Sequence, residues 1–195
     1  MKDLFILARQ VQEFLDARRW RSCVIGGIAV QRWGEPRLTR DVDLTLLTGM
    51  GGEEPYVDEI LRHYRSRVQG GREFALRHRV MLLEASDGTE IDLALGGLPF
   101  EANVMDRCNE FEFYPGMVLR TCSAEDLIVM KAFAERELDW ADVKGIIARQ
   151  GGRLNWRTIL SELGPLCELK GEPEIVARLE QLRKGHRRKG SGSAK

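Results

Sequence analysis

The chain has 195 residues, of which 43% are hydrophobic and 31% are charged, so it is long enough to fold around a core of its own. Lys plus Arg and Asp plus Glu number 30 each, and the resulting net charge of zero excludes a general attraction to nucleic acid. No apolar run approaches the roughly 18–20 residues that cross a bilayer, and acids and arginine interrupt the first apolar residues. We therefore expect a cytoplasmic protein without a membrane partner.

Cysteine and histidine usage gives no sign of a zinc site or a disulfide framework. The four cysteines lie far apart and form no Cys-x-x-Cys pair, so we expect reduced thiols in the core. The three histidines have no metal-ligand spacing. These residues are Cys23, Cys108, Cys122 and Cys167, and His63, His78 and His186.

The first half of the chain alternates helical and strand patterns. Residues 2–19 are predicted to form an amphipathic helix, because their apolar positions recur at helical spacing. A buried strand at about 22–25 is followed by a glycine turn and a short helix that ends before Gly34. A second strand is predicted at about 41–47, and Pro55 is well placed to start a helix over 56–65.

The middle of the chain carries a clear hairpin signal. Residues 80–85 and 89–95 are two apolar runs separated by Asp87-Gly88, which predicts a two-residue turn. Residues 69–72 are expected to form a loop, and 111–121 a further strand or hairpin.

The remainder is predicted to be helical, with helices over 124–138, 140–149, 156–163 and 173–184. Ser123 and Asn155 are suitable N-caps for two of them. The segment 185–195 is basic and then rich in Gly and Ser, which is typical of a disordered tail. The expected organisation is an α/β core with a small mixed sheet over 1–120, a helical segment over 121–184, and the tail over 185–195.

Asp41 and Asp43 stand two positions apart in the second predicted strand. Side chains of a strand alternate with a period of two, so both carboxylates leave the same face, close enough to share divalent cations. Like charges this close repel each other unless a cation lies between them. A metal site for hard cations such as Mg²⁺ is one interpretation, and a polar surface strand is the structural alternative.

Gly26-Gly27 follows the first predicted strand and opens the short helix. Without a Cβ, a glycine lets a phosphate approach the backbone N–H groups, and a helix N-terminus favours an anion. The structural alternative is a tight turn between strand and helix. Together with the acid pair, the turn indicates nucleotide chemistry.

The string from Gly26-Gly27 through Trp33-Gly34, Arg37 and Thr39 to Asp41-Val42-Asp43 resembles the DNA polymerase β-like nucleotidyltransferase superfamily. With Arg37 and Thr39, it looks most like the small prokaryotic nucleotidyltransferases related to AbiEii-type toxins. The resemblance implies a polymerase β-like core, NTP as substrate, and two Mg²⁺ ions held by Asp41, Asp43 and a third acid. Asp92, in the returning hairpin strand, is the residue expected to be that acid.

The resemblance also implies contacts with the nucleotide. Gly26, Gly27, Arg37 and Lys131 are the expected nucleotide-binding residues, with Lys131 as a point charge on the triphosphate and a snorkelling surface lysine as the alternative. Arg37 either contacts phosphate or anchors its loop. For Thr39 we expect a hydrogen bond that fixes the loop.

The predicted activity is transfer of a nucleoside monophosphate from a nucleoside triphosphate, for example ATP, to a hydroxyl group. The acceptor stays open among an RNA end such as that of tRNA, a partner protein and a small molecule, and a toxin–antitoxin role is the favoured context. The alternative is a non-catalytic nucleotide-binding or antitoxin module on the same fold. The sequence gives neither the preferred base nor the oligomeric state.

Overall fold

The structure is a computed structural model that describes residues 2–191, with side chains described as far as residue 186. The chain forms two compact units. The sheet unit comprises the chain up to Ala29 together with Arg37–Ser123, and the helical unit comprises Val30–Pro36 together with the chain from Ala124 onward. The short segment 30–36 therefore leaves the sheet unit and joins the helices, which the sequence did not indicate.

The sheet unit is built on a seven-stranded sheet in the order β3-β4-β5-β2-β1-β7-β6. Strands β2 and β5 are parallel, as are β1 and β7, and the other neighbours are antiparallel. This confirms the predicted α/β fold with a mixed sheet. The strands are β1 (Ser22–Val24), β2 (Asp41–Leu47), β3 (Arg65–Ser66), β4 (Val80–Glu84), β5 (Glu90–Gly96), β6 (Asn109–Tyr114) and β7 (Met117–Thr121).

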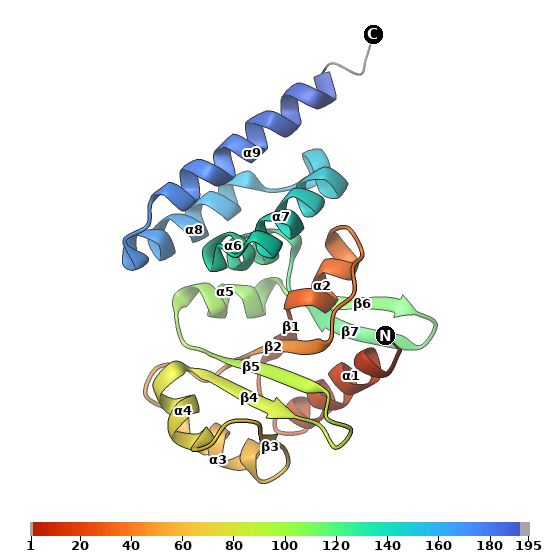
Figure 1. The fold of residues 1–195 in the computed structure, drawn as a ribbon, viewed down its shortest axis with the longest axis vertical. Helices are drawn as coiled ribbons and strands as arrows, with labels where there is room; N and C mark the ends of the chain where they lie inside the picture. Colours follow the sequence, from red (N-terminus) through yellow and green to blue (C-terminus); the bar gives the residue numbers. More distant parts are fainter. Residues whose placement is uncertain (1, 192–195) are drawn as a thin grey trace. The chain divides into compact units, whose positions relative to one another are not determined.

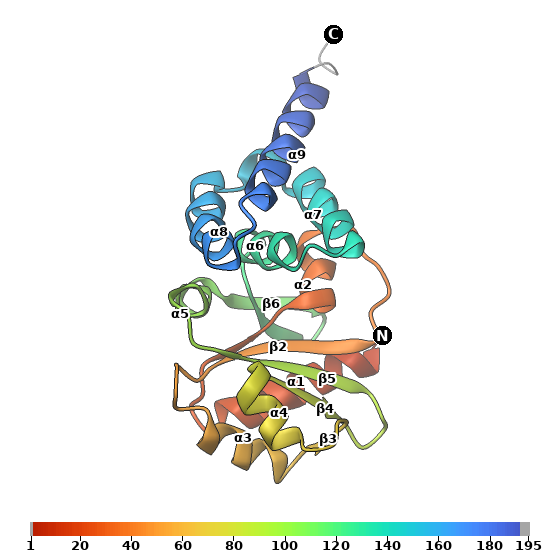
Figure 2. The ribbon, with the colours of Figure 1, turned by 60° about the vertical axis from the view of Figure 1, so that its left-hand side comes forward.

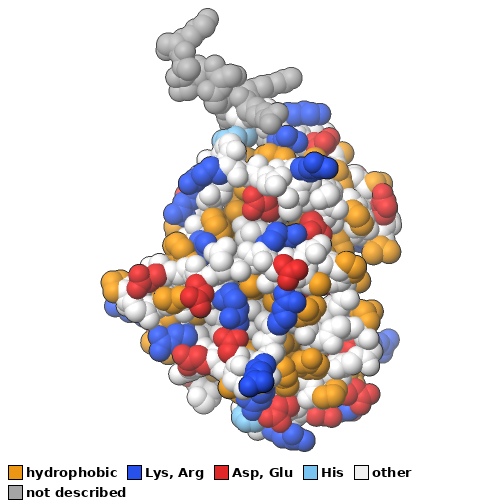
Figure 3. Space-filling view, turned by 180° about the vertical axis from the view of Figure 1, so that it is seen from behind, with side chains coloured by type: hydrophobic (Ala, Val, Ile, Leu, Met, Phe, Trp, Pro, Cys, Tyr) orange, Lys and Arg blue, Asp and Glu red, His pale blue; other side chains and the backbone are white. Residues whose placement is uncertain are grey.

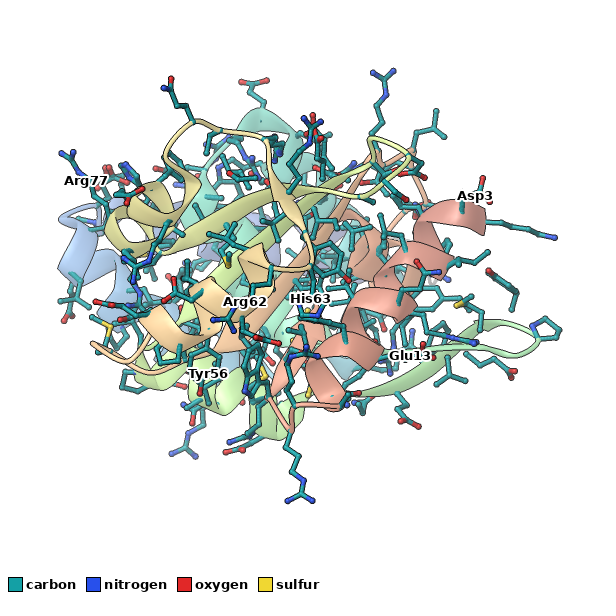
Figure 4. The ribbon with its side chains drawn as sticks, turned by 90° about the horizontal axis from the view of Figure 1, so that it is seen from below. Asp3, Glu13, Tyr56, Arg62, His63 and Arg77 are labelled. Carbon is teal, nitrogen blue, oxygen red and sulfur yellow. The ribbon has the colours of Figure 1, made fainter. Side chains whose placement is uncertain are left out.

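Three helices cover one face of this sheet: α1 (Lys2–Asp16), α3 (Glu54–Leu61) and α4 (Gly71–His78) (Figures 1 and 2). Figure 4 looks onto this layer, with Glu13 carried by α1 and Tyr56 by α3. The apolar stripe of α1 and alternate residues of the strands form one buried cluster there, which includes Leu15, Leu44 and Leu93. Burial of this layer fixes which face each strand residue occupies, because a strand alternates its side chains.

The opposite face of the sheet carries the polar residues of β2. Helix α5 (Pro99–Arg107) lies on this side (Figures 1 and 2) and contacts β2. Helix α2 (Gly26–Trp33) begins directly after β1, and its last turn belongs to the helical unit.

The helical unit contains α6 (Ala124–Ala134), α7 (Glu137–Gln150), a short 3₁₀ helix η1 (Gly151–Arg153), α8 (Trp156–Lys170) and α9 (Glu174–Ser191). Trp140 of α7 is only 1% exposed and belongs to the buried core. Asn155 caps α8 as predicted, because its side chain accepts a hydrogen bond from the Thr158 N–H at 3.2 Å. The segment 30–36 is tied to α7 by hydrogen bonds from Gln150 to the Trp33 carbonyl (2.7 Å) and from Arg149 to the Gly34 carbonyl (2.6 Å).

Several element boundaries differ from the predictions for local reasons. Helix α1 ends at Asp16 because the chain leaves the helix through Arg19, whose φ is 58°. The predicted helix over 124–138 is broken at Glu135, where φ is 60°. The hairpin is confirmed but its turn is longer than two residues, since the Gly88 N–H bonds to the Ala85 carbonyl and Ala85 pairs with Thr89. Gly88 supplies the positive φ of 83° that this turn requires.

The sequence patterns also missed whole elements. Helices α4 and α5 and the two-residue strand β3 were not expected, because each is too short for a clear periodic signal. The prediction of a disordered tail over 185–195 is wrong as far as residue 191, since α9 continues to Ser191. Arg and Lys are good helix formers and extend a helix that already exists. Residues 192–195 lie outside the described part.

Three global expectations can be compared with the described residues. No helix within 2–191 is long and apolar enough to cross a bilayer. On the face shown in Figure 3, acidic and basic side chains are interspersed, which matches the balanced composition. No cysteine of the described part is in a disulfide, and Cys23, Cys122 and Cys167 are buried.

Candidate active site

The acid pair lies on the face of β2 that points away from the main core. Val42 and Leu44 are fully buried on one face, while Asp41 and Asp43 are half-buried on the other. The parallel pairing of β2 with β5 places Asp43 opposite Asp92 and Asp41 opposite Glu90. Paired residues of neighbouring strands share a face and lie about 4.8 Å apart along the hydrogen-bonding direction. The fold therefore gathers four carboxylates on one patch, which we call the acid face: Asp41, Asp43, Glu90 and Asp92.

The two glycines lie against this patch for a steric reason that the sequence does not reveal. A Cβ on Gly26 would stand 1.9 Å from Oδ2 of Asp43, and one on Gly27 would stand 2.2 Å from Oγ1 of Thr39. Gly26 also has a φ of 56°, which L side chains rarely adopt. The N–H of Gly27 donates to Oδ2 of Asp43 at 3.3 Å. The glycine turn thus lets the acid pair and the preceding loop approach the start of α2.

The loop before β2 is fixed to the acid pair by Thr39. Its hydroxyl donates to Oδ1 of Asp41 at 2.7 Å, which confirms the expected loop-fixing hydrogen bond. Arg37 donates to the carbonyl of its neighbour Leu38 at 3.1 Å. Its predicted contact with phosphate stays a prediction.

Asp92 is held by a residue that the sequence did not single out. The guanidinium of Arg67 donates to Oδ1 of Asp92 and lies 3.0 Å from Oε2 of Glu90. Burial raises the pKa of Asp92 above its ordinary value, the charge and hydrogen bond of Arg67 oppose this rise, and the charges of Asp41 and Glu90 add to it. A carboxylate whose pKa is raised is a better proton acceptor, which suits a general base.

The donor set of the acid face fits a hard divalent cation. Carboxylate oxygens are the ligands that Mg²⁺ prefers, and Asp41 and Asp43 project side by side from one strand. Among the described residues, however, no three His, Cys, Asp or Glu side chains are gathered closely enough to form a ready-made metal site. Because Arg67 already binds Asp92, a cation held by all three acids requires this contact to change.

Lys131 is buried within the helical unit and bound to acids. Its ammonium group lies 2.8 Å from Oδ1 of Asp139 and 3.0 Å from Oδ2 of Asp142, and the lysine is only 7% exposed. Arg136 donates a further hydrogen bond to Asp139, from Nε to Oδ2 at 2.5 Å. Lys131 is therefore not a snorkelling surface lysine. Its contact with the triphosphate stays a prediction. The ion pairs with Asp139 and Asp142 favour a structural role for this lysine.

Replacing Gly26 by alanine is expected to lower the free energy of unfolding by about 2–3 kcal/mol. A positive φ costs an alanine about 1–2 kcal/mol, and the new Cβ also displaces the Asp43 carboxylate. Urea denaturation measures the effect. The matched control is Gly88→Ala, because Gly88 also has a positive φ, of 83°, but nothing lies within 4 Å of its Cβ position. Equal losses in the two variants would show that the contact between Gly26 and Asp43 adds no constraint.

Sequence reasoning missed Arg67 and Glu90 as members of this site. Glu90 has a usable signal, since it stands two positions before Asp92 in the same strand and so shares its face. Arg67 has none, because it lies beyond a two-residue strand in a segment without periodicity. Only the pairing of β3 with β4 and of β4 with β5 brings it to the acid face.

Comparison with known proteins identifies the fold. No protein-family model matches the chain, and no curated protein is recognisably similar in sequence. An antigenic nucleotidyltransferase-like protein from Paracoccidioides brasiliensis has a similar structure, with a TM-score of 0.53, 16% identity, and coverage of 92% of this chain and 93% of that chain. This likeness confirms the predicted nucleotidyltransferase fold.

Two further solved structures were found at lower TM-scores. The lincomycin-bound lincosamide antibiotic adenylyltransferase LnuA has a TM-score of 0.48 and 16% identity, over 70% of this chain and 92% of that chain. ANT(2'')-Ia in complex with adenylyl-2''-tobramycin has a TM-score of 0.47 and 19% identity, over 97% of this chain and 99% of that chain.

Proposed function

We propose that the protein is a nucleotidyltransferase that moves a nucleoside monophosphate from a nucleoside triphosphate to a hydroxyl group of an acceptor. The observation that carries this proposal is the register of β2 and β5, which sets Asp92 opposite Asp43. An acid pair alone is common on polar strands. A third acid in register on the neighbouring strand, with a glycine turn packed against the pair, is the arrangement that the chemistry needs.

The reaction joins the acceptor oxygen to the α-phosphorus and breaks the bond from that phosphorus to the oxygen of the departing pyrophosphate. Bound Mg²⁺ would stabilise the negative charge that develops on the attacking and leaving oxygens. Asp41 and Asp43 are the residues proposed to hold it, with Asp92 as a further ligand. Asp92 is also the residue proposed to accept the proton of the acceptor hydroxyl.

The remaining residues orient the acids and the nucleotide. Thr39 holds Asp41 through its hydroxyl, and the Gly27 N–H holds Asp43. These hydrogen bonds keep two like charges in one geometry before the substrate binds, so less ordering is required during the reaction. Gly26, Gly27 and Arg37 are the proposed contacts to the triphosphate, whereas the ion pairs of Lys131 with Asp139 and Asp142 favour a structural role for that lysine.

The acceptor is proposed to be an RNA end, a protein side chain or a small molecule. The string from Gly34 through Arg37 and Thr39 to Asp41 favours the toxin–antitoxin group of nucleotidyltransferases, in which the acceptor is a macromolecule. The balanced net charge means that an RNA acceptor would have to be bound by a local basic patch.

A second candidate is a nucleotide-binding module without turnover. The observation that favours it is the contact of Arg67 with Asp92, since an acid held in an ion pair is not available as a metal ligand. The two candidates differ in one measurable product, because only the enzyme releases pyrophosphate.

A transfer assay tests the proposal. The full chain, with Mg²⁺ and each α-³²P-labelled nucleoside triphosphate, is incubated with total RNA, with lysate protein and with a panel of hydroxyl-bearing antibiotics. We expect label in one of the three fractions, and its loss in the double variant Asp41→Asn/Asp43→Asn. Nucleotide-dependent thermal stabilisation without label or pyrophosphate release would favour the binding module instead.

A further inference from the structure

Arg67 is placed on the acid face by the register of three strands. Ser66 pairs with Leu83 in the antiparallel β3–β4 ladder, and the Arg67 N–H continues this ladder by donating to the Leu82 carbonyl at 3.0 Å. Leu82 in turn pairs with Asp92. Arg67, Leu82 and Asp92 therefore form one row across the sheet, and their side chains share a face. A long side chain is needed in this row, because two strand spacings of about 4.8 Å each separate Arg67 from Asp92.

The guanidinium binds two of the four carboxylates of the acid face. From its position directly after β3 it bridges Asp92 and Glu90, so its planar group satisfies acids that stand two apart on one strand. The side chain of Arg67 is 24% exposed and that of Asp92 is 33% exposed. The Arg67 Nε is buried and has no hydrogen-bond partner. The guanidinium of Arg67 therefore supplies the positive charge on the Asp92 side of the acid face that a bound cation would otherwise supply.

Strand β3, directly before Arg67, holds a second arginine with a different partner. Arg65 forms an ion pair with Glu84 of β4, and its side chain is 79% exposed. Arg65 and Arg67 carry the same guanidinium group two positions apart, but of the two only Arg67 is bound to Asp92.

We propose that Arg67 is a built-in competitor of the divalent cation at Asp92, and that a cation shared by Asp43 and Asp92 binds only when the guanidinium releases Asp92. The physical reason is charge: a guanidinium and a divalent cation on the same carboxylate repel each other, so one excludes the other. Arg67 thus limits occupancy of the Asp92 side of the acid face. The inference rests on the proposed function, because it assumes the metal site at the acid face.

The test is direct Mn²⁺ binding to the full chain, with the free ion measured by electron paramagnetic resonance and with no nucleotide or acceptor present. We expect Arg67→Gln to tighten the binding of Mn²⁺ about tenfold relative to the wild type. Arg67→Met is a second neutral variant that keeps the aliphatic stem across the strand, and it should behave in the same way. Arg67→Lys keeps the positive charge and should stay within about threefold of the wild type.

Two controls separate this inference from the proposed function. Arg65→Gln removes a neighbouring positive charge and should leave the affinity within about twofold. Asp41→Asn/Asp43→Asn should abolish the binding that the wild type shows. If the double variant loses Mn²⁺ but Arg67→Gln and Arg67→Met bind no more tightly than the wild type, the role of Arg67 is overturned and the metal site stands. If the double variant binds like the wild type, or no protein binds Mn²⁺, the metal site and the inference both fail.

Discussion

Asp43→Asn is expected to lower kcat/KM for nucleotidyl transfer about a thousandfold, while the free energy of unfolding changes little. Loss of a metal ligand removes several kcal/mol of transition-state stabilisation, and each factor of ten in rate corresponds to about 1.4 kcal/mol. Asparagine has almost the same size, and its side-chain oxygen can still accept the Gly27 N–H bond that the Asp43 carboxylate accepts at 3.3 Å. The charge is removed, but the packing around the glycine turn is kept.

The measurement is the rate of pyrophosphate release with the acceptor fraction found in the transfer assay. Asp106→Asn is the matched control, because Asp106 is an exposed carboxylate on α5 of the same unit, where it pairs with Arg21. It should retain full activity. A loss of less than tenfold in Asp43→Asn, with an intact Asp106→Asn enzyme, would remove Asp43 from the metal site.

Lys131→Met is expected to lower the free energy of unfolding by about 3–5 kcal/mol, because removing one partner of a buried ion pair is strongly destabilising. Asp139 is 1% exposed and Asp142 is 5% exposed, and the Lys131 ammonium lies within 3.0 Å of both. Arg136 remains bound to Asp139, with its Nε 2.5 Å from Oδ2. Asp142 loses its ion pair with the Lys131 ammonium.

Urea denaturation of Lys131→Met measures this loss, and Lys144→Met on α7 is the control. Lys144 is exposed, so its replacement should change the free energy of unfolding by no more than about 0.5 kcal/mol. The same variants distinguish the two roles of Lys131. Unchanged stability in Lys131→Met, with a large rise in the KM for nucleotide, would contradict the structural role and support a contact with the triphosphate.

Features that depend on a few neighbouring residues were predicted correctly. The acid pair in β2, the hairpin around Gly88 and the Asn155 cap all rest on strand alternation, turn chemistry or capping, which act within a few residues. The parallel partner of β2 was not predicted by any such rule. The resemblance to polymerase β-like nucleotidyltransferases supplied Asp92, and the structure places it opposite Asp43.

Features that depend on distant residues were missed or only partly understood. The glycine turn was interpreted as a phosphate cradle, but the atoms nearest to its missing Cβ positions belong to Asp43 and Thr39. The sequence offered two interpretations of Lys131, as a surface lysine or as a triphosphate-binding lysine. In the structure, its ammonium group instead lies between Asp139 and Asp142 of the next helix.

By itself, the sequence determined which residues can do chemistry and which strand faces they occupy, since side-chain type and alternation are local properties. Only the tertiary structure decided which charges meet. Arg67 reaches Asp92 through two strand pairings that join residues 25 positions apart. The energy of such a pair depends on distance and burial in three dimensions, and a linear sequence contains neither.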